Sequence, residues 1–318
     1  MPIDPVDVFI PLIAPLFAAL TARWLAERLP PRTATWLLTV VASALALITG
    51  VTLGLLALAA VIRIPFIAAV GHLSLRVMTR DDPAALPLGL VAGVLLAIAG
   101  AAAVAAAWRR GGALIAAHRH AHGLPGTGQV VVVADEAADA YAVPGRPCRI
   151  VITSGMMRAL SAPERQVLLA HERAHATGRH YLFMTVARLA SAANPLLRPV
   201  AATIGYSVER WADEQAATAA GDRRLAARTI ARAALAAAAG PPRQDTPASS
   251  LGAVPGVAEL SGAGVVPRRV AALLRPAPQP RLILLAMVVA LVVVCGLLVL
   301  DAAIDLHGLI ELAQTAAG

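Results

Sequence analysis

The chain has 318 residues, of which 58% are hydrophobic, and its mean hydropathy is +0.71. These values exceed those of ordinary soluble domains and indicate an integral membrane protein embedded in a lipid bilayer. The net charge of +8 comes entirely from arginine, but the arginines are dispersed and only 3% of residues are aromatic, which does not favour direct nucleic-acid binding. Cys148 and Cys295 stand far apart, which excludes a disulfide framework and a cysteine zinc site.

Four segments are long and apolar enough to span a bilayer, at residues 8–29, 35–62, 86–108 and 282–300. The first does not resemble a signal peptide, because Asp4 and Asp7 precede it in place of basic residues. Residues 65–78 fit either an interfacial helix or a membrane-dipping turn, and both remain open. We expect an N-terminal membrane domain with three transmembrane helices (1–108), a soluble domain (109–281), and a fourth span with a short external tail (282–318).

Arginine placement predicts the orientation of these spans. Acidic residues lie near both termini, whereas arginines gather at the two ends of the 109–281 segment: Arg109, Arg110 and Arg119 after the third span, and Arg268, Arg269, Arg275 and Arg281 before the fourth. The positive-inside rule then places the 109–281 segment in the cytoplasm and both termini outside the inner (plasma) membrane. Arg63, Arg76 and Arg80, between the second and third spans, argue against this orientation but are outnumbered.

The 109–281 segment combines short strands with helices. Three β-branched runs, at 129–134, 140–143 and 148–153 with a Pro-Gly turn at 144–147, predict a small antiparallel sheet. Ser161 and Glu164 form a capping box, and Gly178 is placed to end the helix that the box begins. Further helices are expected at 181–193, 206–220 and 223–239, with Pro195 and Pro199 breaking the chain between the first two. Residues 240–266 have the composition of a flexible loop.

The capped helix carries His171-Glu172-Arg173-Ala174-His175, an H-E-x-x-H sequence. Four residues make about one helical turn, so His171 and His175 project from one face and can bind one metal ion. Glu172 lies beside them and is placed to polarise a water molecule. The sequence therefore predicts a zinc (Zn²⁺) site with Glu172 as the catalytic base.

A catalytic zinc ion usually takes three protein ligands, so one more residue is needed. His180 follows His175 by only five residues, too close for the pattern in which a third histidine completes the site. Glu209 lies on a separate predicted helix that can pack antiparallel to the first, and we expect it to be the third ligand. Asp213, one turn further on, is expected to accept a hydrogen bond from the outer nitrogen of a ligand histidine.

The motifs H171-E-R-A-H175, E209-R-W-A-D213, A140-Y-A-V-P-G-R-P and I150-V-I-T-S-G resemble those of the gluzincin integral-membrane metallopeptidases. The resemblance is nearest to family M56, the protease part of the β-lactam-sensing BlaR/MecR transducers. The related family M48, which includes the HtpX-type quality-control proteases, shares these motifs. The resemblance implies a polytopic α-helical membrane protein with an inserted α+β gluzincin metalloprotease domain. It also implies that an edge strand near residues 150–154 holds the substrate extended.

The chain departs from the antibiotic-sensing members in one respect. Only 18 residues follow Leu300, and no S-x-x-K acylation motif is present. We therefore do not expect direct β-lactam sensing. A helper for the transition state is also not fixed by the motifs, since His180, Tyr206 and Arg210 are all candidates.

The leading functional hypothesis is a membrane zinc endopeptidase that cleaves a cytoplasmic regulator, such as a BlaI-like transcriptional repressor, in a signalling response. One alternative is an HtpX-like protease for quality control of membrane proteins. A non-catalytic membrane adaptor is disfavoured, because a degenerate site usually loses a ligand or the base, and here all four key residues are present. The substrate, the activating signal and a homo-oligomeric state are left open.

The orientation can be tested with reporter fusions. Reporters placed after Arg119 and at Gly252 are expected to report cytoplasm, and a reporter at Gly318 is expected to report the outside, because of the arginine distribution. A reporter that is active outside when fused at Gly252 would overturn the orientation and the prediction of a cytoplasmic substrate.

Overall fold

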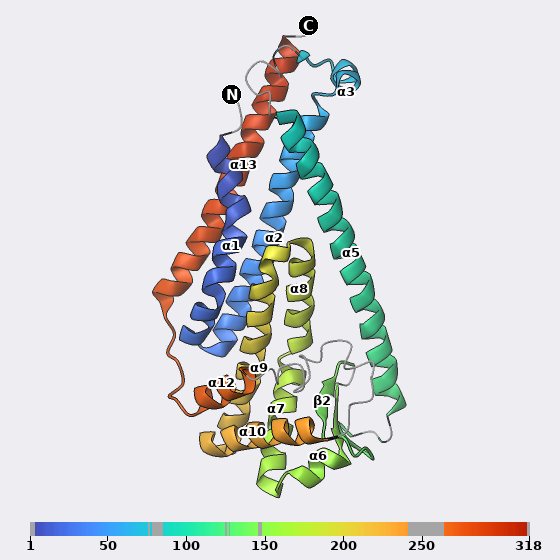
Figure 1. Cartoon of the computed structure of the whole chain (residues 1–318), viewed down its shortest axis with the longest axis vertical. Coiled ribbons are helices and arrows are strands. Elements are labelled where there is room, and N and C mark those ends of the chain that lie inside the picture. Colours follow the sequence, from blue (N-terminus) through green and yellow to red (C-terminus); the bar gives the residue numbers. More distant parts are fainter. Residues whose placement is uncertain are drawn as a thin grey trace.

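The computed structural model describes residues 4–75, 77, 85–124, 126, 128–145, 148–240 and 264–316. A bundle of long helices occupies one end of the molecule, and a smaller group of helices with a sheet occupies the other (Figure 1). Four helices are long and apolar enough to cross a membrane: α1 (Pro5–Arg28), α2 (Pro31–Val61), α5 (Ala85–Gly123) and α13 (Leu282–Thr315). The four segments predicted from hydropathy therefore all form such helices.

Two of these helices extend well beyond the apolar segments that predicted them. α5 continues past Trp108 to Gly123, and in this extension Ala117 and Ala121 pack against Val143 and Val151 of the sheet. α13 remains helical to Thr315, where a short tail was expected after residue 300. The division into domains at residues 108 and 281 stays a prediction.

A short helix, α3 (Pro65–Val70), begins the 65–78 segment, with Pro65 in its first turn. The amide of Ser74 then donates to the carbonyl of Ala313, which attaches this connection to α13. Met78 and residues 79–84 lie outside the described residues, so the choice between an interfacial helix and a membrane-dipping turn stays open.

The sheet has three strands, β1 (Val130–Val133), β2 (Ala140–Val143) and β3 (Arg149–Thr153), in the order β1-β3-β2. β2 and β3 are antiparallel as predicted, but β1 is parallel to β3, so the prediction of a wholly antiparallel sheet is wrong. The physical reason is that the connection at residues 134–139 leads from β1 to the far side of the sheet, where β2 begins. The hairpin then returns the chain as β3, which fits between β2 and β1. β3 is therefore not the expected edge strand, whereas β2 lies at an edge of the described sheet.

Six α-helices and one 3₁₀ helix are described in the rest of this region: α6 (Ser154–Ala159), α7 (Ala162–Thr177), α8 (His180–Ala193), η1 (Pro195–Leu197), α9 (Arg198–Ala220), α10 (Arg223–Ala239) and α12 (Val265–Leu273). The capping box of α7 is confirmed, since the amide of Ser161 donates to Glu164 at 2.8 Å. α9 begins at Arg198 and not near Tyr206, because Pro199 sits in the first turn, where its missing N–H costs little. Most of the predicted flexible loop, at residues 241–263, lies outside the described residues.

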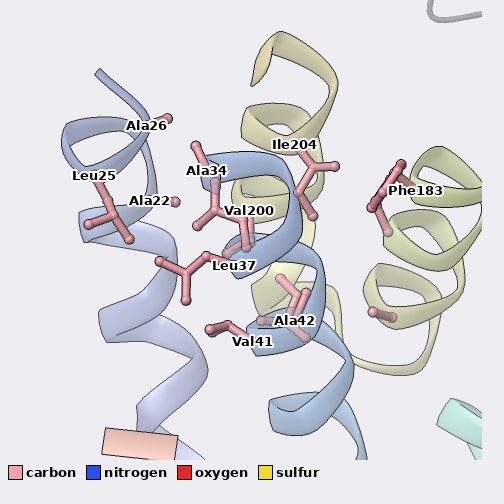
Figure 2. Packing of buried hydrophobic residues seen from close by; sticks show 14 of the residues in the cluster. Ala22, Leu25, Ala26, Ala34, Leu37, Val41, Ala42, Phe183, Val200 and Ile204 are labelled. Carbon is pink, nitrogen blue, oxygen red and sulfur yellow. The ribbon is translucent and has the colours of Figure 1, made fainter. Parts of the chain in front are cut away.

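The hairpin formed by α8, η1 and α9 packs among the long helices of the bundle. Figure 2 shows Val200 and Ile204 of α9 beside α2, with Phe183 of α8 nearby, and all three belong to one buried cluster with residues of α1 and α2. At the tip of the hairpin, the Asn194 amide donates to the hydroxyl of Thr49 on α2 at 3.2 Å. The helix that carries Glu209 is therefore fixed directly to the candidate spans.

Candidate metal centre

Three predicted ligands from two helices meet at one point. His171 and His175 lie one turn apart on α7, and their Nε2 atoms are 3.0 Å from each other. Glu209 on α9 places Oε1 3.3 Å from Nε2 of His175 and Oε2 3.7 Å from Nε2 of His171. One ligand atom from each residue lies within 4.8 Å of the others, so this group could hold a metal ion.

Small side chains allow α7 and α9 to come close enough for this convergence. Ala174 of α7 and Ala212 and Ala216 of α9 are fully buried. Ala216 also packs in one cluster with Val167, which lies one turn before His171 on α7. Because alanines occupy the buried face, the longer histidine and glutamate side chains can meet across the helix pair.

Asp213 lies behind His171, as the sequence predicts. Its Oδ1 atom is 3.1 Å from Nδ1 of His171, the ring nitrogen opposite the one that faces the ligand group. A carboxylate in this position fixes the tautomer and orientation of the imidazole and increases its basicity.

Arg269 of α12 is a site residue that the sequence did not reveal, because there it served only to predict the orientation of the spans. Its guanidinium donates from Nε and Nη2 to the two oxygens of Asp213, at 2.8 Å and 2.6 Å. Its Nη1 atom also lies 2.8 Å from Oε2 of Glu209, and the residue is only 2% exposed. Nothing in the local sequence distinguishes it from Arg268; only the packing of α12 against α9 places it in the site.

Burial and the nearby positive charges shift the pKa of the three carboxyl groups of the site in opposite directions. Burial raises the pKa of both Glu209 and Asp213, but Arg269 and the ligand histidines outweigh it, and each pKa is lowered. For Glu172, burial dominates over the nearby histidines and the pKa is raised. Glu209 and Asp213 are therefore held as anions, while Glu172 takes up a proton more readily than an exposed glutamate does.

His180 contacts the far side of His175. The Nδ1 atoms of the two rings are 2.9 Å apart, and His180 is 1% exposed. Burial, together with the nearby His175, lowers the pKa of His180 to about 2, so the ring is neutral and can accept a hydrogen bond. This position orients His175 and gives no support to the predicted role of His180 as a transition-state helper.

A short break between α7 and α8, at Gly178 and Arg179, brings His180 against His175. Arg179 adopts a left-handed conformation (φ 48°), which is uncommon for a residue other than glycine. A Cβ atom on Gly178 would lie 2.4 Å from Nε2 of His180. Gly178 does end α7, but its φ of −73° is ordinary, so this close approach and not a left-handed cap requires glycine.

The other two candidate helpers lie toward α1 and α12. The Arg210 guanidinium donates to the carbonyl of Ala26 at the end of α1. The Tyr206 ring lies under the Arg268 guanidinium, 4.4 Å from its central carbon. These contacts link α9 to its neighbours, and a helper role for either residue stays a prediction.

The residues present fit a zinc ion. Two imidazole nitrogens and one carboxylate form a donor set that catalytic zinc accepts, with a fourth position left for water or substrate. The outer nitrogens of both histidines have partners, Asp213 and His180, which turn the Nε2 atoms toward Glu209.

Comparison with known proteins agrees with this geometry. The model of Peptidase family M48 matches residues 106–278, a range that includes His171, Glu172, His175, Glu209 and Arg269. No curated protein and no solved structure gives a significant match. Of the two related families suggested by the motifs, the match supports M48, and an assignment to M56 stays a prediction.

The contribution of Arg269 can be measured against its neighbour. Arg269→Gln leaves Asp213 and Glu209 buried without their guanidinium partner, so we expect it to lower the free energy of unfolding by about 3–5 kcal/mol. Arg268→Gln removes a partly exposed contact with Glu27 and the stacking on Tyr206, and should cost about 0–1 kcal/mol. Thermal unfolding of both variants in detergent provides the comparison; equal losses would argue against a structural role specific to Arg269.

Proposed function

The chain belongs to peptidase family M48, and from this premise we propose that it is a membrane-bound zinc endopeptidase. The observation that carries the proposal is the convergence of His171, His175 and Glu209, with Glu172 beside them on α7. The non-catalytic adaptor is disfavoured, because Asp213 of α9 and Arg269 of α12 also hold this group in place.

In the proposed mechanism His171, His175 and Glu209 hold the zinc ion. When bound there, the ion would supply Lewis-acid chemistry, by polarising the scissile carbonyl and lowering the pKa of a water molecule. Glu172 accepts a proton from the attacking water and delivers it to the leaving amide nitrogen. The raised pKa of Glu172 brings its proton affinity closer to that required for both transfers. Asp213 and His180 keep the two imidazoles in their orientations.

We propose that β2 holds the substrate in an extended conformation. β2 lies at an edge of the described sheet and beside α7, and a strand edge can pair with an added peptide strand. Ala140 of β2 also lines a cavity of about 40 Å³ together with His171, Glu172 and apolar residues such as Met156 and Leu168. This lining suits a small apolar side chain next to the bond that is cleaved.

The packing of the site helices favours membrane proteins as substrates. α8 and α9 share a hydrophobic core with α1 and α2, which places the ligand group directly below the bundle. Segments of a membrane protein close to the bilayer would be the first to reach it. This supports the HtpX-like role in membrane-protein quality control, a role that also fits the family.

Cleavage of a cytoplasmic repressor is the second candidate function. It rests on the arginines in the last part of α5 and on those that precede α13, which predict a cytoplasmic location for the site in the inner (plasma) membrane. A soluble regulator would then reach the site without crossing the bilayer.

Substitution separates the role of the base from those of the ligands. Glu172→Gln should retain zinc but lower peptidase activity by about 10²–10⁴-fold, because the ligands remain and the base is lost. His171→Ala, His175→Ala and Glu209→Ala should each lose zinc as well. Glu214→Ala is the matched control on α9, since Glu214 pairs with Arg223 and not with the ligand histidines. Metal analysis and peptide hydrolysis provide the readouts, and full zinc occupancy in Glu209→Ala would exclude it as a ligand.

Comparison of proteomes from cells with the intact protein and with Glu172→Gln distinguishes the two candidate functions. Accumulation of many membrane proteins in the variant is expected for quality control. Accumulation of one DNA-binding regulator, with its target genes held repressed, would favour repressor cleavage instead. If neither pattern occurs under envelope stress, both assignments of substrate are wrong.

A further inference from the structure

A large groove lies between α1 and the α8–η1–α9 hairpin, which packs among the long helices. It has a volume of about 820 Å³ and is formed by α1, the α8–η1–α9 hairpin and the start of α12. Its wall is apolar at one end, with Leu16, Leu20 and Leu196, and carries Arg23, Tyr206 and Arg268 at the other. The exposed Arg198 is not among its lining residues. The groove is therefore amphipathic along its length.

The arginine end of the groove coincides with the expected membrane surface. Trp24 and Trp36 lie near the ends of α1 and α2 closest to the sheet, and Trp108 lies within α5 where its apolar segment ends; the three are 46%, 53% and 84% exposed. Tryptophan is enriched where a span meets the headgroup layer. Because Arg23 precedes Trp24, the arginine end lies at this level, and Leu16 and Leu20 extend from it into the apolar layer.

The dimensions and charge of the groove fit one lipid molecule. From Leu196 of η1 to Tyr206 of α9, the helical chain rises by about 15 Å, which accommodates much of an acyl chain. At the surface end, Arg23 and Arg268 both contact the carboxylate of Glu27, at 3.4 Å and 2.9 Å. Two guanidinium groups around one carboxylate leave an excess positive charge, and a lipid phosphate would complement it.

α12 connects this groove to the metal centre through two consecutive residues. Arg268 lines the groove and lies over the ring of Tyr206, whereas Arg269 is buried and bound to Asp213 and Glu209. α12 lies beneath the sheet-facing end of α1 (Figure 1). The two helices are joined by the ion pair between Arg268 and Glu27. A ligand that holds Arg268 also restrains the position of Arg269.

We propose that the groove binds an anionic glycerophospholipid, with its acyl chain along Leu16, Leu20 and Leu196 and its phosphate at Arg23 and Arg268. Occupancy holds α12 against α1 and α9 and thereby keeps Arg269 in place beside Glu209. The bilayer then contributes to the stability of the metal centre through its anionic lipids.

Lipid titration of delipidated protein in detergent tests the binding site. The probes are phosphatidylglycerol and phosphatidylcholine, and bound lipid is counted by native mass spectrometry. The intact protein should bind one phosphatidylglycerol in preference to phosphatidylcholine. Arg268→Gln and Arg23→Gln should each lower the affinity for phosphatidylglycerol by about fivefold, as expected from the loss of one arginine near a membrane surface. Arg109→Gln is the matched control, since Arg109 is an exposed arginine next to Trp108 on α5.

A second variant keeps the proposal testable without changing charge. Ala202 is exposed and lines the groove, so Ala202→Trp should fill the acyl-chain part and abolish the preference for phosphatidylglycerol while helix content is unchanged. Equal binding of both lipids by the intact protein, or an unchanged preference in Ala202→Trp, would overturn the lipid site. Loss of membrane-protein cleavage in Ala202→Trp with no change in lipid binding would identify the groove as a substrate site instead.

The rate of zinc release tests the link between the groove and the metal centre. This test rests on the proposed function, in which the site binds zinc. Phosphatidylglycerol should slow the release of zinc to a chelator several-fold in the intact protein and in Arg109→Gln, but not in Arg268→Gln. Lipid binding without any effect on zinc release would refute the coupling through α12 and leave the lipid site intact. Absence of zinc from the intact protein would count against the proposed function and not against the lipid site.

Discussion

Two carboxylates buried side by side on α9 are the constraint on which the rest of the site depends. Glu209 and Asp213 are almost completely shielded from solvent, and an isolated carboxylate in such a position would be strongly disfavoured. Arg269 supplies the compensating charge, with two contacts to Asp213 and one to Glu209. The contact between α12 and α9 therefore compensates these two carboxylates, and the contact between α9 and α7 brings them to the histidines. Without α12, both carboxylates would be buried without their guanidinium partner.

The second feature of the architecture is that the membrane bundle and the metal centre share α9. One end of α9 packs against α1 and α2 through Val200 and Ile204, while the other end carries Glu209 and Asp213. Arg210 adds a hydrogen bond from the same helix to the end of α1. Because a helix is stiff over this length, a shift of the bundle would be transmitted to the ligand group. This gives a physical route by which the state of the membrane can influence the site.

The sequence by itself determined the elements whose signals are local. The four apolar helices, the capping box at Ser161 and the H-E-x-x-H spacing depend only on residues within a few turns of each other, so periodicity and capping rules identify them. The partnership of Glu209 with the two histidines was also anticipated, although it crosses between helices, because the spacing of Glu209 and Asp213 places both on one face.

Only the tertiary structure decided the relations between distant segments. The parallel pairing of β1 with β3 depends on which strand takes the central position, and hydrophobic pattern alone does not encode that order. The burial of α8 and α9 among the candidate spans depends on shape complementarity with α2. Arg268 and Arg269 are adjacent arginines, yet Arg268 lines a groove and Arg269 pairs with the buried carboxylates of the metal centre. The physical reason is that the role of a charged side chain depends on what the fold packs against it, which lies outside its local sequence.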